Sequence, residues 1–248
     1  LRRRLPSESI VYLGDTARVP YGTRSASTVV RYALGCARLL LDRGVKAIVV
    51  ACNTVSAVAL DMLRVELDVP VLGVIEPGAS AAVQAAEEGV IGILGTPGTI
   101  ASGAYPRAVA AKSTRAEVIG QAAPLLVPLA EEGWTEGEVP RLVVRRYLEP
   151  IVAANARVIV LGCTHYPLLY ETIRDEAARL AGHPIPLVDG AQATAEAVAT
   201  FLEERDELSP RTHRGSLELL VTDLPASFAS IAERFLGEPL PKVEQVDL

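Results

Sequence analysis

Short apolar runs alternate with longer amphipathic stretches along most of the chain. The longer stretches at 25–43 and 138–154 repeat apolar residues at helical spacing, and Gly44 and Gly89 are predicted to end helices. The short runs are rich in Val and Ile and are bounded by Gly or Pro, which is typical of buried strands. They cover residues 9–14, 46–51, 69–74, 90–95, 116–120, 157–162 and 185–188. This alternation predicts an α/β protein with mainly parallel, doubly wound sheets, in which ligands bind beyond the carboxyl ends of strands.

Two segments of the chain share one plan. Residues 46–54 and 157–165 each contain an apolar strand, a small residue, a cysteine and polar residues that begin a helix. Cys52 and Cys163 are separated by about the length of one small α/β domain. We therefore expect two pseudo-symmetric domains with the active site in the cleft between them. The predicted division assigns residues 1–77 and 187–248 to the domain of Cys52, and residues 78–186 to the domain of Cys163.

Composition narrows the class of protein. The 248 residues are 50% hydrophobic and only 4% aromatic, which excludes a disordered or fibrous chain. The net charge of -6 argues against a nucleic-acid partner. No apolar run reaches the roughly 18 to 20 residues that a membrane helix needs, so we expect no membrane partner. Three cysteines are too few for a disulfide framework, and they indicate free thiols in a reducing, cytoplasmic compartment.

The positions of the two repeated cysteines favour chemistry. At a turn from strand to helix, unpaired backbone N–H groups and the helix dipole lower the pKa of a thiol, so we expect thiolate at both positions. Asn53 or Thr54 is predicted to cap the helix after Cys52. His165 follows Cys163 by two residues and is a candidate base or proton relay.

The cysteines also admit a structural role and a metal-binding role. A single cysteine in an apolar segment is more often a small buried hydrophobe, and Cys36 is assigned that role. Cys163 and His165 resemble half of a zinc site, but no further Cys or His completes a tetrahedral set at a known spacing. We therefore expect no metal.

The glycine-rich stretch 92–99 does not fit the dinucleotide-binding pattern. Its Thr96 and Thr99 are candidates to bind a carboxylate at a helix start, and an ordinary helix cap is the alternative. Asp15, at a predicted strand end beside glycine, is either a functional residue or a turn residue.

The chain resembles the glutamate racemases through five motifs in the same order. They are YLGDT with VPYG at 12–16 and 19–22, ACNT at 51–54, GVIEPG at 73–78, PLLVP with Glu131 at 124–131, and LGCTHYP at 161–167. The resemblance implies a cofactor-independent isomerase that interconverts L- and D-glutamate and supplies D-glutamate for peptidoglycan synthesis. It also implies a homodimer and two proton-transfer thiols, Cys52 and Cys163. The residues implied to line the substrate site are Tyr21, Gly22, Asn53, Thr54, Thr164 and His165, with Thr96 and Thr99 added from the helix start, and Asp15 and Glu131 as helpers.

One departure from the family pattern concerns the start of the chain. Glutamate racemases begin with a strand that ends in Asp-Ser-Gly-x-Gly-Gly and assists the thiol corresponding to Cys52, and nothing here matches it. We expect Leu1 to lie within the helix that follows that motif. The alternatives left open are an aspartate or hydantoin racemase, which shares the two-cysteine plan, and a non-catalytic amino-acid-binding homologue.

Overall fold

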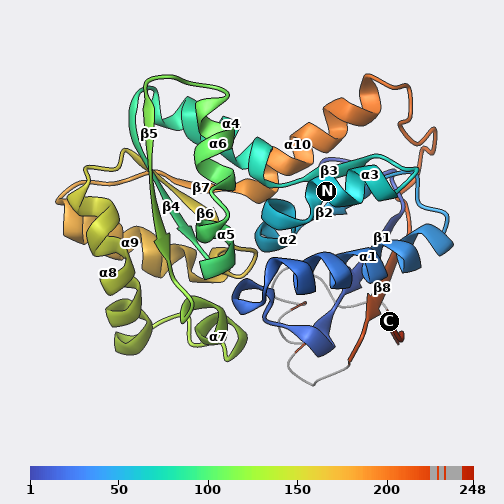
Figure 1. The fold of residues 1–248 in the computed structure, drawn as a ribbon, viewed down its shortest axis with the longest axis horizontal. Helices are drawn as coiled ribbons and strands as arrows, with labels where there is room; N and C mark the ends of the chain where they lie inside the picture. Colours follow the sequence, from blue (N-terminus) through green and yellow to red (C-terminus); the bar gives the residue numbers. More distant parts are fainter. Residues whose placement is uncertain (224–227, 229–231, 233–241) are drawn as a thin grey trace.

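The computed structural model describes residues 1–223, 228, 232 and 242–248, which contain three sheets (Figure 1). All strand pairs in these residues are parallel. The first sheet has the strand order β1 (Ile10–Gly14), β8 (Leu217–Val221), β9 (Val243–Gln245). The second sheet pairs β2 (Ile48–Val50) with β3 (Val71–Gly73). The third sheet has the strand order β5 (Ala116–Ala122), β4 (Gly89–Gly95), β6 (Val158–Gly162), β7 (Leu187–Asp189).

Helices connect most of these strands. The α-helices are α1 (Ala26–Asp42), α2 (Asn53–Val58), α3 (Leu60–Glu66), α4 (Ile75–Ala86), α5 (Pro97–Ala101), α6 (Ala104–Ala110), α7 (Leu126–Glu131), α8 (Glu138–Ala153), α9 (Tyr170–Ala181) and α10 (Gly190–Glu203). Three short 3-10 helices are η1 (Thr16–Arg18), η2 (Tyr21–Thr23) and η3 (Tyr166–Leu169). Among the described residues, no helix has both the length and the apolar character needed to cross a membrane.

The four-stranded sheet is covered by helices on both faces. In Figure 1, α8 and α9 lie on one side of β4, β5 and β6, and α4 and α6 lie on the other. Side chains alternate accordingly along β6: Val158 and Val160 pack with α4 and α6, while Ile159 and Leu161 pack with α8 and α9. Burial on both faces explains why this strand is a continuous apolar run. The predicted doubly wound α/β class is confirmed.

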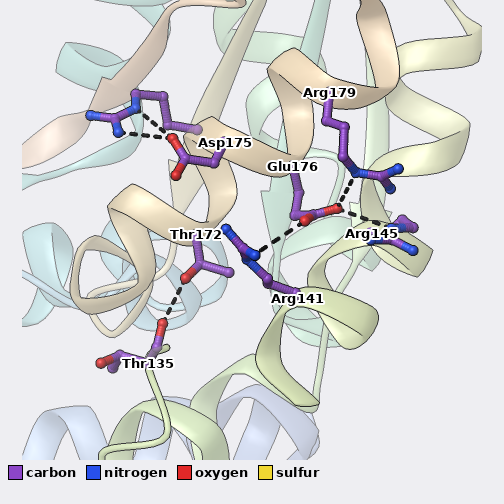
Figure 2. Close-up of polar contacts among 8 residues, drawn as sticks. Thr135, Arg141, Arg145, Thr172, Asp175, Glu176 and Arg179 are labelled. Carbon is purple, nitrogen blue, oxygen red and sulfur yellow. Dashed lines mark hydrogen bonds and ion pairs between the residues drawn. The ribbon is translucent and has the colours of Figure 1, made fainter. Parts of the chain in front are cut away.

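An ion-pair cluster joins α8 to α9 (Figure 2). The Nε atoms of Arg145 and Arg179 each donate to Oε2 of Glu176 at 3.0 Å, and Arg141 Nε lies 3.8 Å from Oε1. The Glu176 side chain is only 3% exposed. Burial alone raises the pKa of this carboxyl group, but the hydrogen bonds from Arg145 and Arg179 outweigh burial and lower it.

Most predicted elements are present within one or two residues. All seven predicted strands form, and α1 begins after Ser25, whose hydroxyl accepts from the N–H of Thr28, and is followed by the left-handed Gly44. The prediction for Gly89 was wrong: α4 ends before Glu87, which itself takes a positive φ, and Gly89 begins β4. The sequence pattern also did not indicate β8 and β9.

The start of the described chain differs from the expected helix. The backbone N–H groups of Arg4 and Leu5 both donate to the carbonyl of Leu1, at 2.9 and 2.8 Å, which makes one turn and no helix. Leu5 packs against Val198 and Leu202 of α10. This contact holds the first residues against a helix that lies far away in sequence.

The two repeated segments fold alike. β2 pairs with β3 and β6 pairs with β7, each in parallel and each across a connection that has a cysteine at or next to its start. β7 therefore lies in the four-stranded sheet with β6, although the predicted boundary assigns residues from 187 onward to the first domain. The division into two domains stays a prediction.

Candidate active site

Both repeated cysteines lie at the carboxyl ends of parallel strands. Cys163 directly follows β6, and Cys52 follows β2 after one residue. Cys52 itself is the N-cap residue of α2, so the prediction that Asn53 or Thr54 caps this helix was wrong. Its extended backbone, with φ of -76° and ψ of 123°, is typical of the N-cap position.

The surroundings of Cys52 act on its thiol in opposite directions. Burial raises the pKa of Cys52, whereas hydrogen bonds from the backbone N–H groups of Val55 and Thr54 and from the Thr54 hydroxyl lower it. The net direction is upward. The expectation of thiolate was therefore wrong for the free protein, because loss of hydration outweighs the donors of the helix start.

The thiol of Cys163 is also shifted toward its protonated form. The residue is 7% exposed, and burial raises its pKa to about 12. Donors from the backbone of His165 and from Thr164, an exposed residue, act in the opposite direction. Negative charge on Cys52 raises the pKa of Cys163 further. The two sulfurs therefore lie close enough for the charge of one to oppose the charge of the other.

A chain of polar groups leads away from Cys163. Nδ1 of His165 lies 3.9 Å from the Cys163 sulfur, and Nε2 of the same ring lies 3.3 Å from Oε1 of Glu131 on α7. A histidine with one nitrogen near a thiol and the other near a carboxylate can accept the thiol proton and keep its positive charge paired. The structure thus brings the predicted residues His165 and Glu131 together at this cysteine.

Three buried hydroxyls join the helix after Cys52 to the start of α5, the helix after β4. Thr54 Oγ1 lies 2.9 Å from Thr96 Oγ1 and 3.3 Å from Thr99 Oγ1, and the latter two oxygens are 3.0 Å apart. Thr96 also caps α5, because its hydroxyl accepts from the N–H of Thr99. The ordinary capping role is therefore present at the same residues that were proposed to bind a carboxylate.

The segment that carries Tyr21 and Gly22 packs against these hydroxyls. A Cβ added to Gly22 would lie 2.5 Å from Cβ of Thr96, so only glycine allows this approach. The Tyr21 hydroxyl donates to Oδ2 of Asp15, and Arg18 Nε donates to Oδ1 at 2.9 Å. Asp15 thus anchors η2 beside the threonines, and in this structure it contacts neither cysteine through a hydrogen bond.

One residue near both cysteines was missed by sequence reasoning. Tyr105 on α6 is 2% exposed, and its hydroxyl donates to Oδ1 of Asn53 at 2.8 Å. Burial raises the pKa of Tyr105, and charge on Cys163 raises it further. Its position in the sequence fits the apolar face of a helix, so no local pattern distinguishes it from a core residue.

Within the residues that the structure describes, no three His, Cys, Asp or Glu side chains gather in a way that suits a metal ion. Two surface cavities have volumes of about 930 and 800 Å³, and neither cysteine lines them. The cleft between two domains stays a prediction.

Comparison by sequence identifies relatives over the full chain. The family model described as Asp/Glu/Hydantoin racemase matches residues 1–198. A glutamate racemase of Geobacter metallireducens is 47% identical over 246 residues, which are 99% of this chain and 90% of the relative. A glutamate racemase of Syntrophus aciditrophicus is 45% identical over 248 residues, which are 100% of this chain and 90% of the relative.

Comparison of folds gives the same result. The glutamate racemase of Francisella tularensis in complex with D-glutamate superimposes with a TM-score of 0.90 at 35% identity, covering 99% of this chain and 90% of that one. A glutamate racemase isoform of Bacillus anthracis superimposes with a TM-score of 0.93 at 36% identity, covering 100% of this chain and 91% of that one. The glutamate racemase of Thermus thermophilus, solved in complex with beta-chloro-D-alanine, superimposes with a TM-score of 0.84 at 43% identity, covering 100% of this chain and 90% of that one.

Proposed function

Because this chain belongs to the Asp/Glu/Hydantoin racemase family and is 45% and 47% identical to the two glutamate racemases compared above, we propose that it interconverts L- and D-glutamate. One observation of the structure supports the chemistry most directly. Cys52 and Cys163 stand at equivalent strand ends, and the charge of Cys52 acts on the thiol of Cys163.

Inversion of a carbon centre needs a proton acceptor on one face and a proton donor on the other. Two thiols of opposite protonation state supply both groups. Electrostatic repulsion between Cys52 and Cys163 favours this state, because a second negative charge beside the first is costly. In the proposed reaction one thiolate removes the α-proton while the opposite thiol donates a proton, and their starting states are reversed for the other enantiomer.

The thiolate has to form against the effect of burial. At Cys163, His165 accepts the thiol proton and Glu131 pairs with the resulting imidazolium. At Cys52, the donors are the backbone N–H groups of Thr54 and Val55. The ammonium group of a bound amino acid adds positive charge beside the sulfurs and stabilises the thiolate of either cysteine.

The polar groups between the two cysteines are proposed to bind the substrate. Hydroxyl and amide donors suit the carboxylates of glutamate, and they stabilise the charge that develops when the α-proton leaves. Exclusion of water strengthens these hydrogen bonds, which matters because the proposed mechanism uses no cofactor as an electron sink. The proposed substrate-binding residues are Tyr21, Gly22, Asn53, Thr54, Thr96, Thr99, Thr164 and His165.

Three further parts of the proposal come from the family resemblance. The D-glutamate produced is proposed to supply peptidoglycan synthesis, the protein to reside in the cytoplasm, and the active species to be a homodimer. Light scattering of the purified protein tests the last of these, and a monomer at working concentration would contradict it.

The activity is tested by incubating the purified protein with L-glutamate and separating the enantiomers by chiral chromatography. Accumulation of D-glutamate up to equal amounts of both enantiomers is the expected result. L-Aspartate is tested in parallel, because racemisation confined to aspartate would contradict the proposed substrate. Absence of turnover with either amino acid would favour a non-catalytic binding protein.

A further inference from the structure

Tyr105 connects the surroundings of one proposed catalytic cysteine to those of the other. Its ring lies beside Gly162, the residue before Cys163: a Cβ added there would be 3.4 Å from Cε2 of the tyrosine. Its hydroxyl donates to Oδ1 of Asn53, the residue after Cys52, at 2.8 Å. A single side chain thus spans from one cysteine segment to the other.

This hydrogen bond fixes the orientation of the Asn53 amide. Among the described residues, the Tyr105 hydroxyl has no second acceptor and the Nδ2 group of Asn53 has no acceptor at all. A buried hydroxyl needs an acceptor, so the amide oxygen turns toward Tyr105 and the NH₂ group turns away from it. The two N–H donors of Asn53 are then available to a ligand beside Cys52.

The fold makes room for the tyrosine hydroxyl. A Cβ added to Gly78 on α4 would lie 3.2 Å from that oxygen, which is tighter than an ordinary contact. Burial raises the pKa of Tyr105, and charge on Cys163 raises it further. The hydroxyl therefore keeps its proton, and remains a donor, at neutral pH.

We propose that Tyr105 is a positioning residue for substrate binding: it holds the oxygen of the Asn53 amide, so that the amide N–H groups face a carboxylate of the amino-acid substrate. The inference rests on the proposed racemase function, in which Asn53 contacts the substrate. Tyr105 acts through Asn53 and exchanges no proton itself.

The variant Tyr105→Phe removes the hydroxyl and keeps the ring. The expected result is a rise of about tenfold in KM for both glutamate enantiomers, with kcat changed less than about threefold, because an amide without its fixed partner loses its orientation in the free and bound protein. An unchanged KM, or a fall confined to kcat, would overturn the proposal.

Thr172→Val is a matched control for lost stability. The Thr172 hydroxyl is buried and donates to the carbonyl oxygen of Thr135 at 2.6 Å, near the Glu176 cluster (Figure 2). This variant should lower Tm and leave KM unchanged. If it raised KM as much as Tyr105→Phe does, the effect of the tyrosine would be merely structural and the proposal would fail.

A second pair of variants tests the position of the Tyr105 hydroxyl without removing it. Gly78→Ala presses a methyl group against the Tyr105 oxygen and should raise KM in the same direction. Gly35→Ala, also within a helix, meets nothing within 4 Å and should leave KM unchanged. Equal KM values for these two variants would count against the proposal.

The double variant Asn53→Ala with Tyr105→Phe tests the route of the effect. If Tyr105 acts only through Asn53, KM of the double variant should equal that of Asn53→Ala alone. Independent, multiplying effects would contradict the proposed route.

Failure of this inference can be distinguished from failure of the proposed function. If the unaltered protein racemises glutamate and Tyr105→Phe keeps its KM, only the inference fails. If the unaltered protein does not racemise glutamate, the rise in Tm caused by D-glutamate is compared for the two proteins. A smaller rise for Tyr105→Phe supports the positioning role, and equal rises, or none, overturn it.

Discussion

Cys52 and Cys163 occupy the same place in two similar β-strand and helix units, yet their side-chain surroundings differ. Each thiol receives backbone N–H groups from the residues that follow it, and each is shifted toward its protonated form by burial. Among the described residues, only Cys163 has a histidine backed by a carboxylate. The backbone repeat thus places two thiols, and the neighbouring side chains determine how each one is ionised.

The largest predicted effect tests whether both cysteines are needed. Cys52→Ser and Cys163→Ser should each lower the rate of glutamate racemisation by about 10²- to 10⁴-fold, because a hydroxyl replaces the proton-transfer group. Chiral chromatography of the products measures both. Cys36→Ser replaces a half-buried cysteine that has no part in the proposed reaction, so its rate should stay within about twofold of the unaltered protein. Survival of full turnover in either of the first two variants would contradict the two-thiol account.

The next effect concerns the protonation of Cys163. Since its pKa of about 12 lies above the usual value of about 8.5, its thiolate fraction at pH 8 should be lower than that of glutathione by on the order of 10²-fold or more. Alkylation by iodoacetamide, followed by peptide mapping, measures this in the substrate-free protein.

The pH dependence of the alkylation rate distinguishes a thiol that is protonated from a thiol that the reagent cannot reach. The alkylation rate of Cys163 should keep rising between pH 9 and 11, where the rate of glutathione levels off. A rate at pH 8 equal to that of glutathione would show that the pKa of Cys163 is not raised above that of an ordinary thiol, and it would contradict this part of the comparison.

A smaller effect tests the asymmetry between the two thiols. His165→Gln keeps the backbone N–H that bonds to Cys163 but removes the ring, and it should lower kcat/KM by about 10- to 100-fold. The fall must be equal for L- and D-glutamate, because the two enantiomers have equal free energies. Unequal falls would indicate an error in the assay, and no fall would exclude His165 from the reaction.

Glu131→Gln tests the carboxylate that pairs with His165. The Glu131 side chain is 36% exposed, so solvent weakens its pairing with His165 and a loss of only about two- to fivefold is expected. A loss larger than that of His165→Gln would contradict the order Cys163, His165, Glu131.

The smallest expected effect on activity is at Glu176, outside the comparison of the cysteines. Glu176→Gln should leave kcat/KM unchanged and lower the free energy of unfolding at neutral pH by about 1 to 3 kcal/mol, since three guanidinium groups lose a charged partner.

The stabilisation by Glu176 should depend on pH, because the pKa of its carboxyl group is lowered in the folded protein. The stabilisation is therefore present above the usual glutamate pKa of about 4.3 and is lost as the pH falls further. Thermal unfolding at pH 7 and pH 3 should show the difference between the two proteins shrink.

Much of the fold was predictable because buried parallel strands are continuous apolar runs. β8 and β9 were missed for physical reasons. The run Leu217–Val221 consists mostly of leucine and glutamate, which have no strong preference for strands, and Val243–Gln245 has three residues of which two are polar. Their identity as strands depends on pairing with β1 and with each other, which no local pattern contains.

The candidate site was predictable where residues follow one another in a motif. The strand-end cysteines and His165 were found in this way, but the direction of the cysteine pKa shifts was not, because burial depends on the whole fold. Tyr105 was missed because its partner Asn53 lies 52 positions away in the sequence. Contacts of this kind are set by packing between elements.

The most direct test of the central claim follows the α-hydrogen during racemisation of L-glutamate in D₂O. If two thiols act from opposite faces, the D-glutamate formed at low conversion carries deuterium at the α-carbon, whereas the unreacted L-glutamate keeps its protium. Mass spectrometry after chiral separation distinguishes the two pools. Protium retained in the D-glutamate, as expected when one group both removes and returns the hydrogen, would contradict the account.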